Sequence, residues 1–177
     1  MLNSIVQIAG IISESVVDGP GLRSTIFFQG CDHACKDCHN PETWDPKGGT
    51  SMLLQDLVSK LGLNPLITGV TFSGGDPFFQ ATVAAELGCF LKDQGLNLWV
   101  YTGYTWEYLL NHSENAGFRA LLDVTDVLVD GPFQIEKKSL KLPFRGSSNQ
   151  RLINVSKSIQ TGVVVEWQPA IRAAVEI

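Results

Sequence analysis

Residues 24–40, STIFFQGCDHACKDCHN, join an apolar, strand-like segment directly to three closely spaced cysteines. Three residues separate Cys31 from Cys35, and two residues separate Cys35 from Cys38. Iron–sulfur clusters are normally held by four cysteine thiolates, so three thiolates could bind three irons of a cubane cluster and leave the fourth iron without a protein ligand. An open coordination position is typical of a catalytic metal centre, and the spacing therefore predicts an enzyme with these three cysteines as metal ligands.

Two other interpretations of the triplet have to be weighed. A structural zinc site could take His33 or His39 as its fourth ligand, although zinc ligands usually come in two separated pairs. A disulfide framework is disfavoured because no secretory signal precedes the motif and three clustered thiols cannot all pair. The fourth cysteine, Cys89, lies in an apolar stretch, where we expect it to be a plain core residue.

The sequence around the triplet resembles the radical S-adenosylmethionine superfamily, whose cluster motif has the same three-then-two spacing. VDGPGLR at residues 17–23 and HNPETW at residues 39–44 are similar to motifs of the glycyl-radical-enzyme activases within that superfamily. VLVDGPF at residues 127–133 and GSSNQR at residues 146–151 further resemble the activating proteins of anaerobic ribonucleoside-triphosphate reductases. The matching blocks run from about residue 11 to about residue 155, which is most of the chain.

This resemblance implies an activase that uses a [4Fe-4S] cluster to cleave S-adenosylmethionine reductively and to generate a glycyl radical on the large subunit of the anaerobic ribonucleotide reductase. A small electron donor, such as a flavodoxin or a ferredoxin, would be a second partner. The nearest alternative is an activase of another glycyl radical enzyme, of the formate-lyase type, and the other is a zinc-binding module without catalysis. Hydrogen-atom abstraction needs no general acid or base, so we expect no catalytic proton-transfer residue.

A second motif, TFSGGDP at residues 71–77, ends a strand-like segment and opens a loop. Two glycines allow a ligand to approach the backbone because no Cβ stands in the way, although such residues also favour plain turns. The resemblance assigns Gly74, Gly75 and Asp76 to the methionyl amino group of S-adenosylmethionine. It also places the backbone of Asp37, Cys38 and His39 near the cofactor, but Asp37 stands where many members of the superfamily carry an aromatic or apolar residue.

Apolar runs alternate with amphipathic runs along the chain, and this alternation predicts one α/β domain with a mostly parallel sheet. The expected strands are residues 24–29, 69–73, 98–102, 126–129 and 152–155, and the expected helices are residues 51–61, 79–94, 106–112 and 117–122. Thr50 or Ser51 could cap the first helix, and Thr105 the third. A closed eight-unit barrel needs about 250 residues, so 177 residues favour an open, partial (βα) barrel.

Such a sheet is expected to carry its site at the carboxyl ends of its strands. We divide the chain into a core domain, residues 1–161, and a C-terminal tail of unknown role, residues 162–177. Within the tail, residues 163–167 could form a strand and residues 170–175 a short helix.

Composition and charge exclude some classes of partner. The net charge is −5 and no run of Lys or Arg is visible, which argues against a nucleic-acid partner. No apolar run approaches the roughly 18 residues of a transmembrane helix, so we expect no membrane partner. Free thiols without an export signal point to the cytoplasm.

The sequence alone leaves more than one role for a few polar side chains, and it predicts a packing role for three tryptophans. Arg23 could hold a carboxylate or a partner's backbone, or simply be a solvated residue at the start of a strand. Asn149 and Arg151 could touch the cofactor or the incoming glycine loop, or belong to a plain turn. Trp44, Trp99 and Trp106 are expected to be packing residues.

Overall fold

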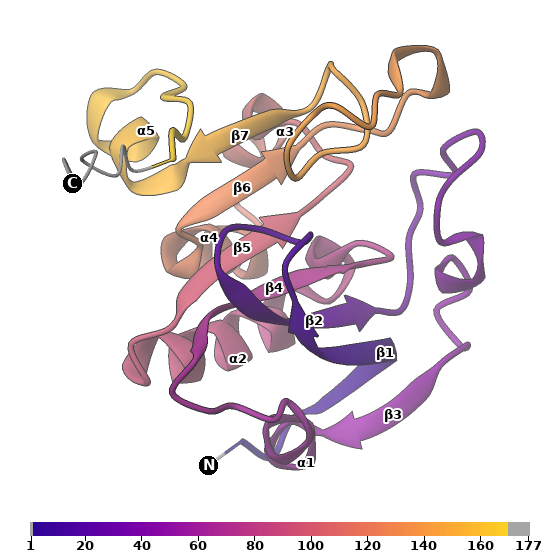
Figure 1. The fold of residues 1–177 in the computed structure, drawn as a ribbon, viewed down its shortest axis with the longest axis vertical. Helices are drawn as coiled ribbons and strands as arrows, with labels where there is room; N and C mark the ends of the chain where they lie inside the picture. Colours follow the sequence, from indigo (N-terminus) through magenta and orange to yellow (C-terminus); the bar gives the residue numbers. More distant parts are fainter. Residues whose placement is uncertain (1, 170–177) are drawn as a thin grey trace, which may run out of the picture.

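The structure, a computed structural model, describes residues 2–169 of the chain. Within this range the strands form a seven-stranded sheet in the order β3-β1-β2-β4-β5-β6-β7 (Figure 1). The strands are β1 (Ile5–Ser15), β2 (Leu22–Phe28), β3 (Thr50–Leu53), β4 (Ile67–Gly74), β5 (Asn97–Tyr101), β6 (Val127–Asp130) and β7 (Arg151–Asn154). The helices are α1 (Leu54–Lys60), α2 (Ala81–Asp93), α3 (Trp106–Asn111), α4 (Ala116–Val124) and α5 (Val155–Thr161), with short 3₁₀ turns η1 (Pro41–Thr43), η2 (Pro77–Gln80) and η3 (Ile135–Lys137).

The centre of the sheet is parallel and its margins are antiparallel. Neighbouring strands among β2, β4, β5 and β6 run in the same direction. Strand β1 is antiparallel to β2 and β3 is antiparallel to β1, while β7 is antiparallel to β6. Five of the seven strands therefore point the same way, and β3 and β7 remain unpaired with each other in the described chain. The prediction of one α/β domain with an open, mostly parallel sheet is confirmed.

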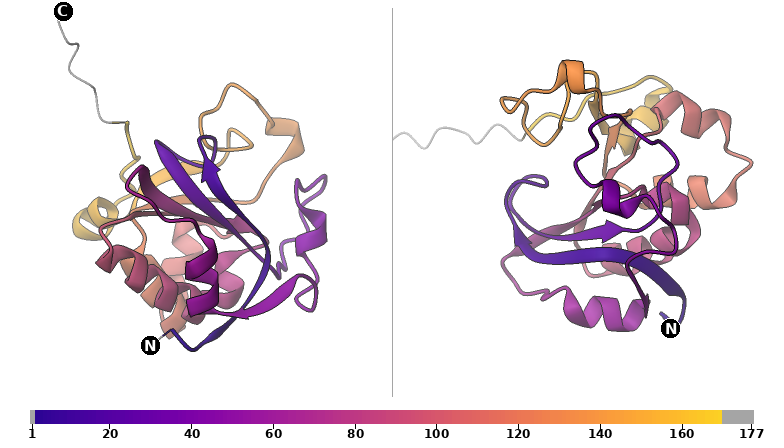
Figure 2. Two further views of the ribbon diagram at one scale, coloured as in Figure 1. Left: turned by 60° about the horizontal axis from the view of Figure 1, so that its bottom comes forward. Right: turned by 90° about the vertical axis from the view of Figure 1, so that its right-hand side faces the viewer.

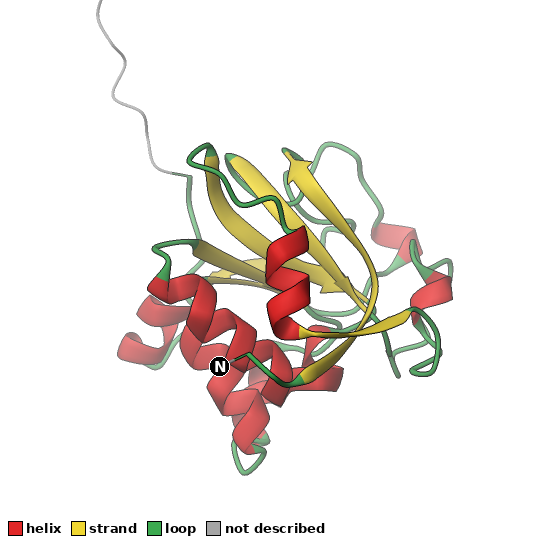
Figure 3. Cartoon of the chain, turned by 90° about the horizontal axis from the view of Figure 1, so that it is seen from below, coloured by secondary structure: helices red, strands yellow, loops and turns green. Residues whose placement is uncertain are grey.

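The helices cover one face of the sheet, as seen from below in Figure 3. Alternate strand residues such as Ile26, Phe72 and Leu98 point to this face and are fully buried against the helices. The intervening residues point to the opposite face, where Trp99, Val127, Val129 and Leu152 form a second, smaller apolar cluster. Period-two alternation along each strand produces this division, because successive side chains leave a strand on opposite sides.

Two of the predicted helix starts can be checked against the structure. The segment predicted as a helix over residues 51–61 is divided, because Thr50–Leu53 pairs with β1 as strand β3 and α1 begins only at Leu54. The capping prediction for Thr50 or Ser51 is therefore wrong, since Leu53 is the N-cap and offers no side-chain acceptor. Thr105 does cap α3, by accepting a hydrogen bond from the amide of Tyr108.

Two strands and one α-helix lie outside the sequence-based predictions. Strand β1 and strand β3 form the antiparallel margin beside β2, and α5 follows β7 directly. Residues 163–167 contribute an isolated bridge between Glu166 and Ile153 of β7 rather than a regular strand. The helix expected over residues 170–175 lies outside the described residues, and no helix among residues 2–169 is long and apolar enough to cross a bilayer.

Candidate functional site

The cysteine loop leaves the sheet at the end of β2 and is closed at its base by backbone hydrogen bonds. The amide of Gly30 donates to the carbonyl of Thr43 at 2.8 Å, and the amide of Cys31 donates to that of Trp44 at 3.2 Å. Gly30 has a φ of +98°, and a Cβ at this position would lie 2.5 Å from the ring of Phe79. Glycine is therefore required where the chain turns out of the strand.

Inside the loop the backbone makes two turns that ordinary residues rarely adopt. Ala34 and Asp37 have φ values of +46° and +54°. Left-handed conformations of non-glycine residues cost of order 1–3 kcal/mol and cluster at functional sites. The amide of Cys38 donates to the carbonyl of Cys35, and the amide of Asn40 lies 3.4 Å from the sulfur of Cys38. These turns bring all three cysteines to the wall of one cavity.

The remaining walls of this cavity come from the carboxyl ends of the parallel strands. Ser73 and Gly74 end β4 and Gly75 follows it, Tyr101 ends β5 and is followed by Thr102 and Gly103, and Gly131 and Phe133 follow β6. In Figure 1 the purple loop after β2 and the orange segment between β6 and β7 both lie at the right, beyond the ends of the parallel strands. This end of the sheet faces the viewer in the right-hand view of Figure 2. The expectation that the site lies at the carboxyl ends of strands matches this arrangement.

The glycine turn packs directly on the root of the cysteine loop. Gly75 donates its amide to the carbonyl of Phe28 at 2.8 Å, and Asp76 donates its amide to the carbonyl of Gly30 at 2.9 Å. A Cβ on Gly75 would lie 2.4 Å from the Gly30 oxygen, and Gly74 has a φ of +97°. The two motifs that the sequence singled out are therefore adjacent in space, and the fit between them requires glycine.

The structure thus brings Cys31, Cys35, Cys38, His39, Gly74 and Gly75 to one cavity. The other two predicted cofactor residues lie differently. Asp37 is exposed on the loop. The Asp76 side chain is buried and accepts hydrogen bonds from the amides of Phe78 and Gly103 and from the Thr102 hydroxyl, with His33 close by.

Comparison with known proteins identifies the family of this chain. Residues 17–153 match the family model described as a 4Fe-4S single cluster domain. The chain is 37% identical over 144 residues to the anaerobic ribonucleoside-triphosphate reductase-activating protein of Vibrio cholerae, covering 76% of this chain and 89% of that protein. It is 35% identical over 143 residues to the protein of the same name from Escherichia coli, covering 76% of this chain and 90% of that protein.

The chain belongs to the family of anaerobic ribonucleoside-triphosphate reductase-activating proteins. It is also 37% identical over 134 residues to the pyruvate formate-lyase-activating enzyme of Clostridium pasteurianum, covering 71% of this chain. The match spans only 55% of that enzyme, so the chain corresponds to about half of its length.

The residues around the cavity fit the cluster that the family model describes. Thiolates are soft ligands suited to iron–sulfur clusters, and each cysteine of a cubane binds a different iron. Among residues 2–169, no group of three His, Cys, Asp or Glu side chains is placed to hold a single metal ion. Burial raises the pKa of the Cys31 thiol to about 11 and also raises the pKa of Cys35. Both thiols must therefore release protons when a metal binds.

Arg23 fulfils neither of the roles that the sequence left open for it. Its side chain is 1% exposed, and its donors bond Thr71 Oγ1 at 2.8 Å and the carbonyls of Val70 and Asn97 at 2.7 and 3.1 Å. The guanidinium also lies over the ring of Trp99. Burial lowers the pKa of Arg23 to about 10, so the group stays cationic at neutral pH. Arg23 therefore ties β2 to β4 and β5 on the face without helices.

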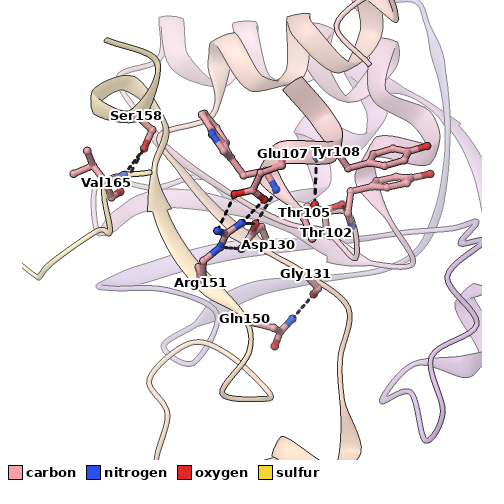
Figure 4. Close-up of polar contacts among 12 residues, drawn as sticks. Thr102, Thr105, Glu107, Tyr108, Asp130, Gly131, Gln150, Arg151, Ser158 and Val165 are labelled. Carbon is pink, nitrogen blue, oxygen red and sulfur yellow. Dashed lines mark hydrogen bonds and ion pairs between the residues drawn. The ribbon is translucent and has the colours of Figure 1, made fainter. Parts of the chain in front are cut away.

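The GSSNQR segment makes internal contacts, which Figure 4 shows in part. Arg151 pairs with Asp130 and Glu107, and the Asn149 amide donates to the carbonyl of Pro132 at 2.8 Å. Gln150 lines the cavity and donates to the carbonyl of Gly131 at 3.1 Å (Figure 4). In this structure Arg151 therefore braces the β6–β7 pair, and Gln150 is the member of the segment that reaches the cavity.

Several lining residues were missed by sequence reasoning. Tyr101, Thr102 and Gly103 lie at the carboxyl end of β5, where the same rule that located the glycine turn could have found them. Trp44, which was expected to be a packing residue, also lines the cavity, whereas Trp99 and Trp106 are buried in the core. Cys89 is exposed on α2, so its assignment to the core is wrong; it occupies the solvent-facing side of an amphipathic helix.

Proposed function

We propose that this chain is an activase that generates a glycyl radical on the anaerobic ribonucleoside-triphosphate reductase. The observation that carries the proposal is the cavity lined by Cys31, Cys35, Cys38 and the Gly74–Gly75 turn, in a chain of this family. Cysteines that can leave one iron open, beside a glycine turn that admits a ligand to the backbone, suit a cluster that binds a second cofactor.

Cys31, Cys35 and Cys38 would hold three irons of a [4Fe-4S] cluster. When bound, the reduced cluster and S-adenosylmethionine supply the radical chemistry, in which the cofactor is cleaved reductively and a hydrogen atom is taken from a backbone glycine of the partner. The protein supplies binding, orientation and exclusion of water. No side chain is assigned as a general acid or base.

Gly74 and Gly75 would admit the methionyl end of S-adenosylmethionine to the backbone of the turn. Asp37, Cys38 and His39 would contact the cofactor from the cysteine loop, Asp37 through its backbone because its side chain is exposed. Asp76 would help to bind the methionyl amino group, and its buried carboxylate also holds the turn that carries the two glycines.

The partners follow from the same proposal. The large reductase subunit would supply the glycine, and a small electron donor such as a flavodoxin or a ferredoxin would reduce the cluster, in the cytoplasm and without nucleic acid or membrane. Residues 1–161 would form the catalytic core. Residues 162–177 would be an appended tail, whose first part contacts the core where Trp167 packs against Trp99 at 4.9 Å between ring centroids.

A second candidate is an activase of the formate-lyase type. The observation that favours it is the 37% identity to the enzyme from Clostridium pasteurianum, which equals the identity to the reductase-activating protein of Vibrio cholerae. The match spans 55% of the length of the Clostridium pasteurianum enzyme but 89% of the length of the Vibrio cholerae protein, and this difference favours the reductase as the partner.

The test is anaerobic reconstitution with iron and sulfide, followed by reduction in the presence of S-adenosylmethionine with either glycyl radical enzyme. Release of methionine and 5′-deoxyadenosine together with a glycyl radical on the reductase is the expected result. Cleavage with a radical only on the formate lyase would establish the second candidate. A colourless, zinc-loaded protein that cleaves nothing would overturn both.

A further inference from the structure

His33 lies in the cysteine loop, between Cys31 and Cys35, yet its ring reaches outside the loop. Its Nε2 atom lies 2.5 Å from Oδ2 of Asp76, the residue that follows the glycine turn. The His33 side chain is 17% exposed and that of Asp76 is 2% exposed. A close polar contact between two side chains so little exposed to water is more specific than a surface pair, because neither group exchanges its partner freely with solvent.

The end of β5 provides a slot for the His33 ring. A Cβ on Gly103 would lie 2.3 Å from Cδ2 of His33, so the ring occupies the space that a side chain at residue 103 would need. The Tyr104 ring meets the imidazole edge-on, with 4.5 Å between ring centroids. Packing on two sides and a hydrogen bond on the third hold the ring in one orientation.

The Asp76 carboxylate also forms hydrogen bonds with other segments of the chain. Its Oδ2 atom also accepts from the hydroxyl of Thr102 at 2.8 Å and from the amide of Gly103 at 3.0 Å. Its Oδ1 atom accepts from the amide of Phe78 at 2.9 Å and so caps η2. One carboxylate therefore joins the cysteine loop, the glycine turn and the end of β5.

We infer that His33 is a positioning residue that couples the cysteine loop to the Gly74–Gly75 turn. This inference rests on the proposed function, and it assigns to His33 the task of holding the cysteine loop in register with the cofactor-binding turn. The loop needs such an anchor because its segment between the first and third cysteines contains two left-handed residues, Ala34 and Asp37. Without the His33 contact this strained segment would relax away from the turn.

The test compares five variants, four single and one double, with the wild-type full chain. His33→Ala removes the anchor, and His33→Gln restores an amide donor toward Asp76. Gly103→Ala keeps His33 but fills its slot, because the new methyl would overlap the imidazole. Lys36→Ala removes an exposed side chain of the same loop and serves as the matched control. The double variant of His33 and Gly103 tests whether both changes act on one contact.

Two readouts are used. Hydrogen–deuterium exchange of residues 31–38 in the metal-free protein measures how firmly the cysteine loop is held. The spectrum of the reduced, reconstituted protein, titrated with S-adenosylmethionine, measures cofactor binding. We expect His33→Ala and Gly103→Ala each to accelerate exchange and to raise the half-saturating cofactor concentration about ten-fold, the scale of effects of outer-shell partners. His33→Gln should recover most of the loss, and Lys36→Ala should match the wild type. The double variant should lose no more than one single variant, because coupled residues are not additive.

Wild-type exchange and wild-type titration in both His33→Ala and Gly103→Ala would overturn the inference, and so would additive losses in the double variant. Should His33→Ala fail to fold, Gly103→Ala and His33→Gln decide the matter by the same two readouts. A wild-type protein that binds no cluster or no S-adenosylmethionine would instead overturn the proposed function, while exchange in the metal-free protein would still support or refute the anchor.

Discussion

Asp130 and Arg151 face each other across the antiparallel pair of β6 and β7, and Arg151 also reaches Glu107 on α3 (Figure 4). The Nε atom of Arg151 lies 3.0 Å from Oδ1 of Asp130, while its terminal nitrogens lie 3.0 and 2.8 Å from the Glu107 oxygens. Asp130 is 1% exposed and also accepts from the amide of Trp106 at 2.8 Å. The pair thus braces the strand end from which Gly131 enters the site.

Replacing Arg151 by Met should therefore destabilise the protein strongly. The change leaves Asp130 as a buried carboxylate without its cation, and we expect a loss of about 3 kcal/mol in the free energy of unfolding. Glu107→Gln should cost less than about 1 kcal/mol, because Glu107 is exposed and such pairs contribute little. Urea denaturation of the three proteins measures the difference, and equal losses in the two variants would contradict it.

Gly75→Ala tests the contact between the glycine turn and the cysteine loop. The added Cβ would meet backbone atoms of Gly30 and Thr43, which cannot move aside as a side chain could. We expect a loss of roughly 1–3 kcal/mol in stability, the scale of overpacking, together with a lower iron content after reconstitution. Gly10→Ala is the control, because a Cβ there meets nothing within 4 Å. Unchanged stability and iron content in Gly75→Ala would show that the two segments can separate without cost.

The buried hydroxyl of Tyr101 should make the stability of the protein depend on pH. Its hydroxyl donates to the carbonyl of Phe144 at 2.7 Å, and burial, with a smaller effect of Asp18, raises its pKa above the ordinary value of about 10. The folded protein therefore retains a proton that the unfolded chain releases above about pH 10, so the contribution of Tyr101 to stability falls as the pH rises past that value.

The stability of the wild type relative to Tyr101→Phe measures this contribution. We expect the wild type to be more stable by about 1 kcal/mol at pH 8, the usual net contribution of one hydrogen bond, and the difference to shrink when the pH is raised above 10. Urea denaturation at several pH values checks this. A difference that grows at alkaline pH would mean that Tyr101 ionises more readily in the folded state.

Substitution of each cysteine should distinguish the three predicted iron ligands from Cys89. Cys31→Ala, Cys35→Ala and Cys38→Ala each remove a predicted iron ligand, so we expect loss of the iron–sulfur absorbance and of S-adenosylmethionine cleavage. Cys89→Ala should retain both, because Cys89 is exposed on α2 and is not one of the residues that line the cavity. Iron content, visible absorbance and methionine release are measured on the reconstituted proteins. Cleavage that persists in one variant of the triplet would remove that cysteine from the ligand set.

The strands at the centre of the sheet were predictable because their apolar runs are short and end at turn residues, as at Gly74 and Gly131. Strand β1 was missed because its sequence, IVQIAGIISES, carries Ala and Gly at its centre and two irregularities in its pairing with β2. The sequence predicts helix where strand β3 forms, because four residues are too few to show a strand period. The conformation of β3 depends on hydrogen bonds to β1, whose paired residues lie 42 to 48 positions earlier in the chain.

The sequence alone determined the spacing of the three cysteines, the glycine turn and the parallel centre of the sheet, because each of these depends on residues close together in the chain. Only the tertiary structure decided what the charged and polar side chains do. The Asp76 carboxylate contacts groups that follow β2 and β5, and Arg23 donates hydrogen bonds to acceptors on β4 and β5. Arg151 forms ion pairs with Asp130 and Glu107. A buried polar group is satisfied by whichever partner the fold brings near it, and in these cases the partners lie 21 to 74 residues away.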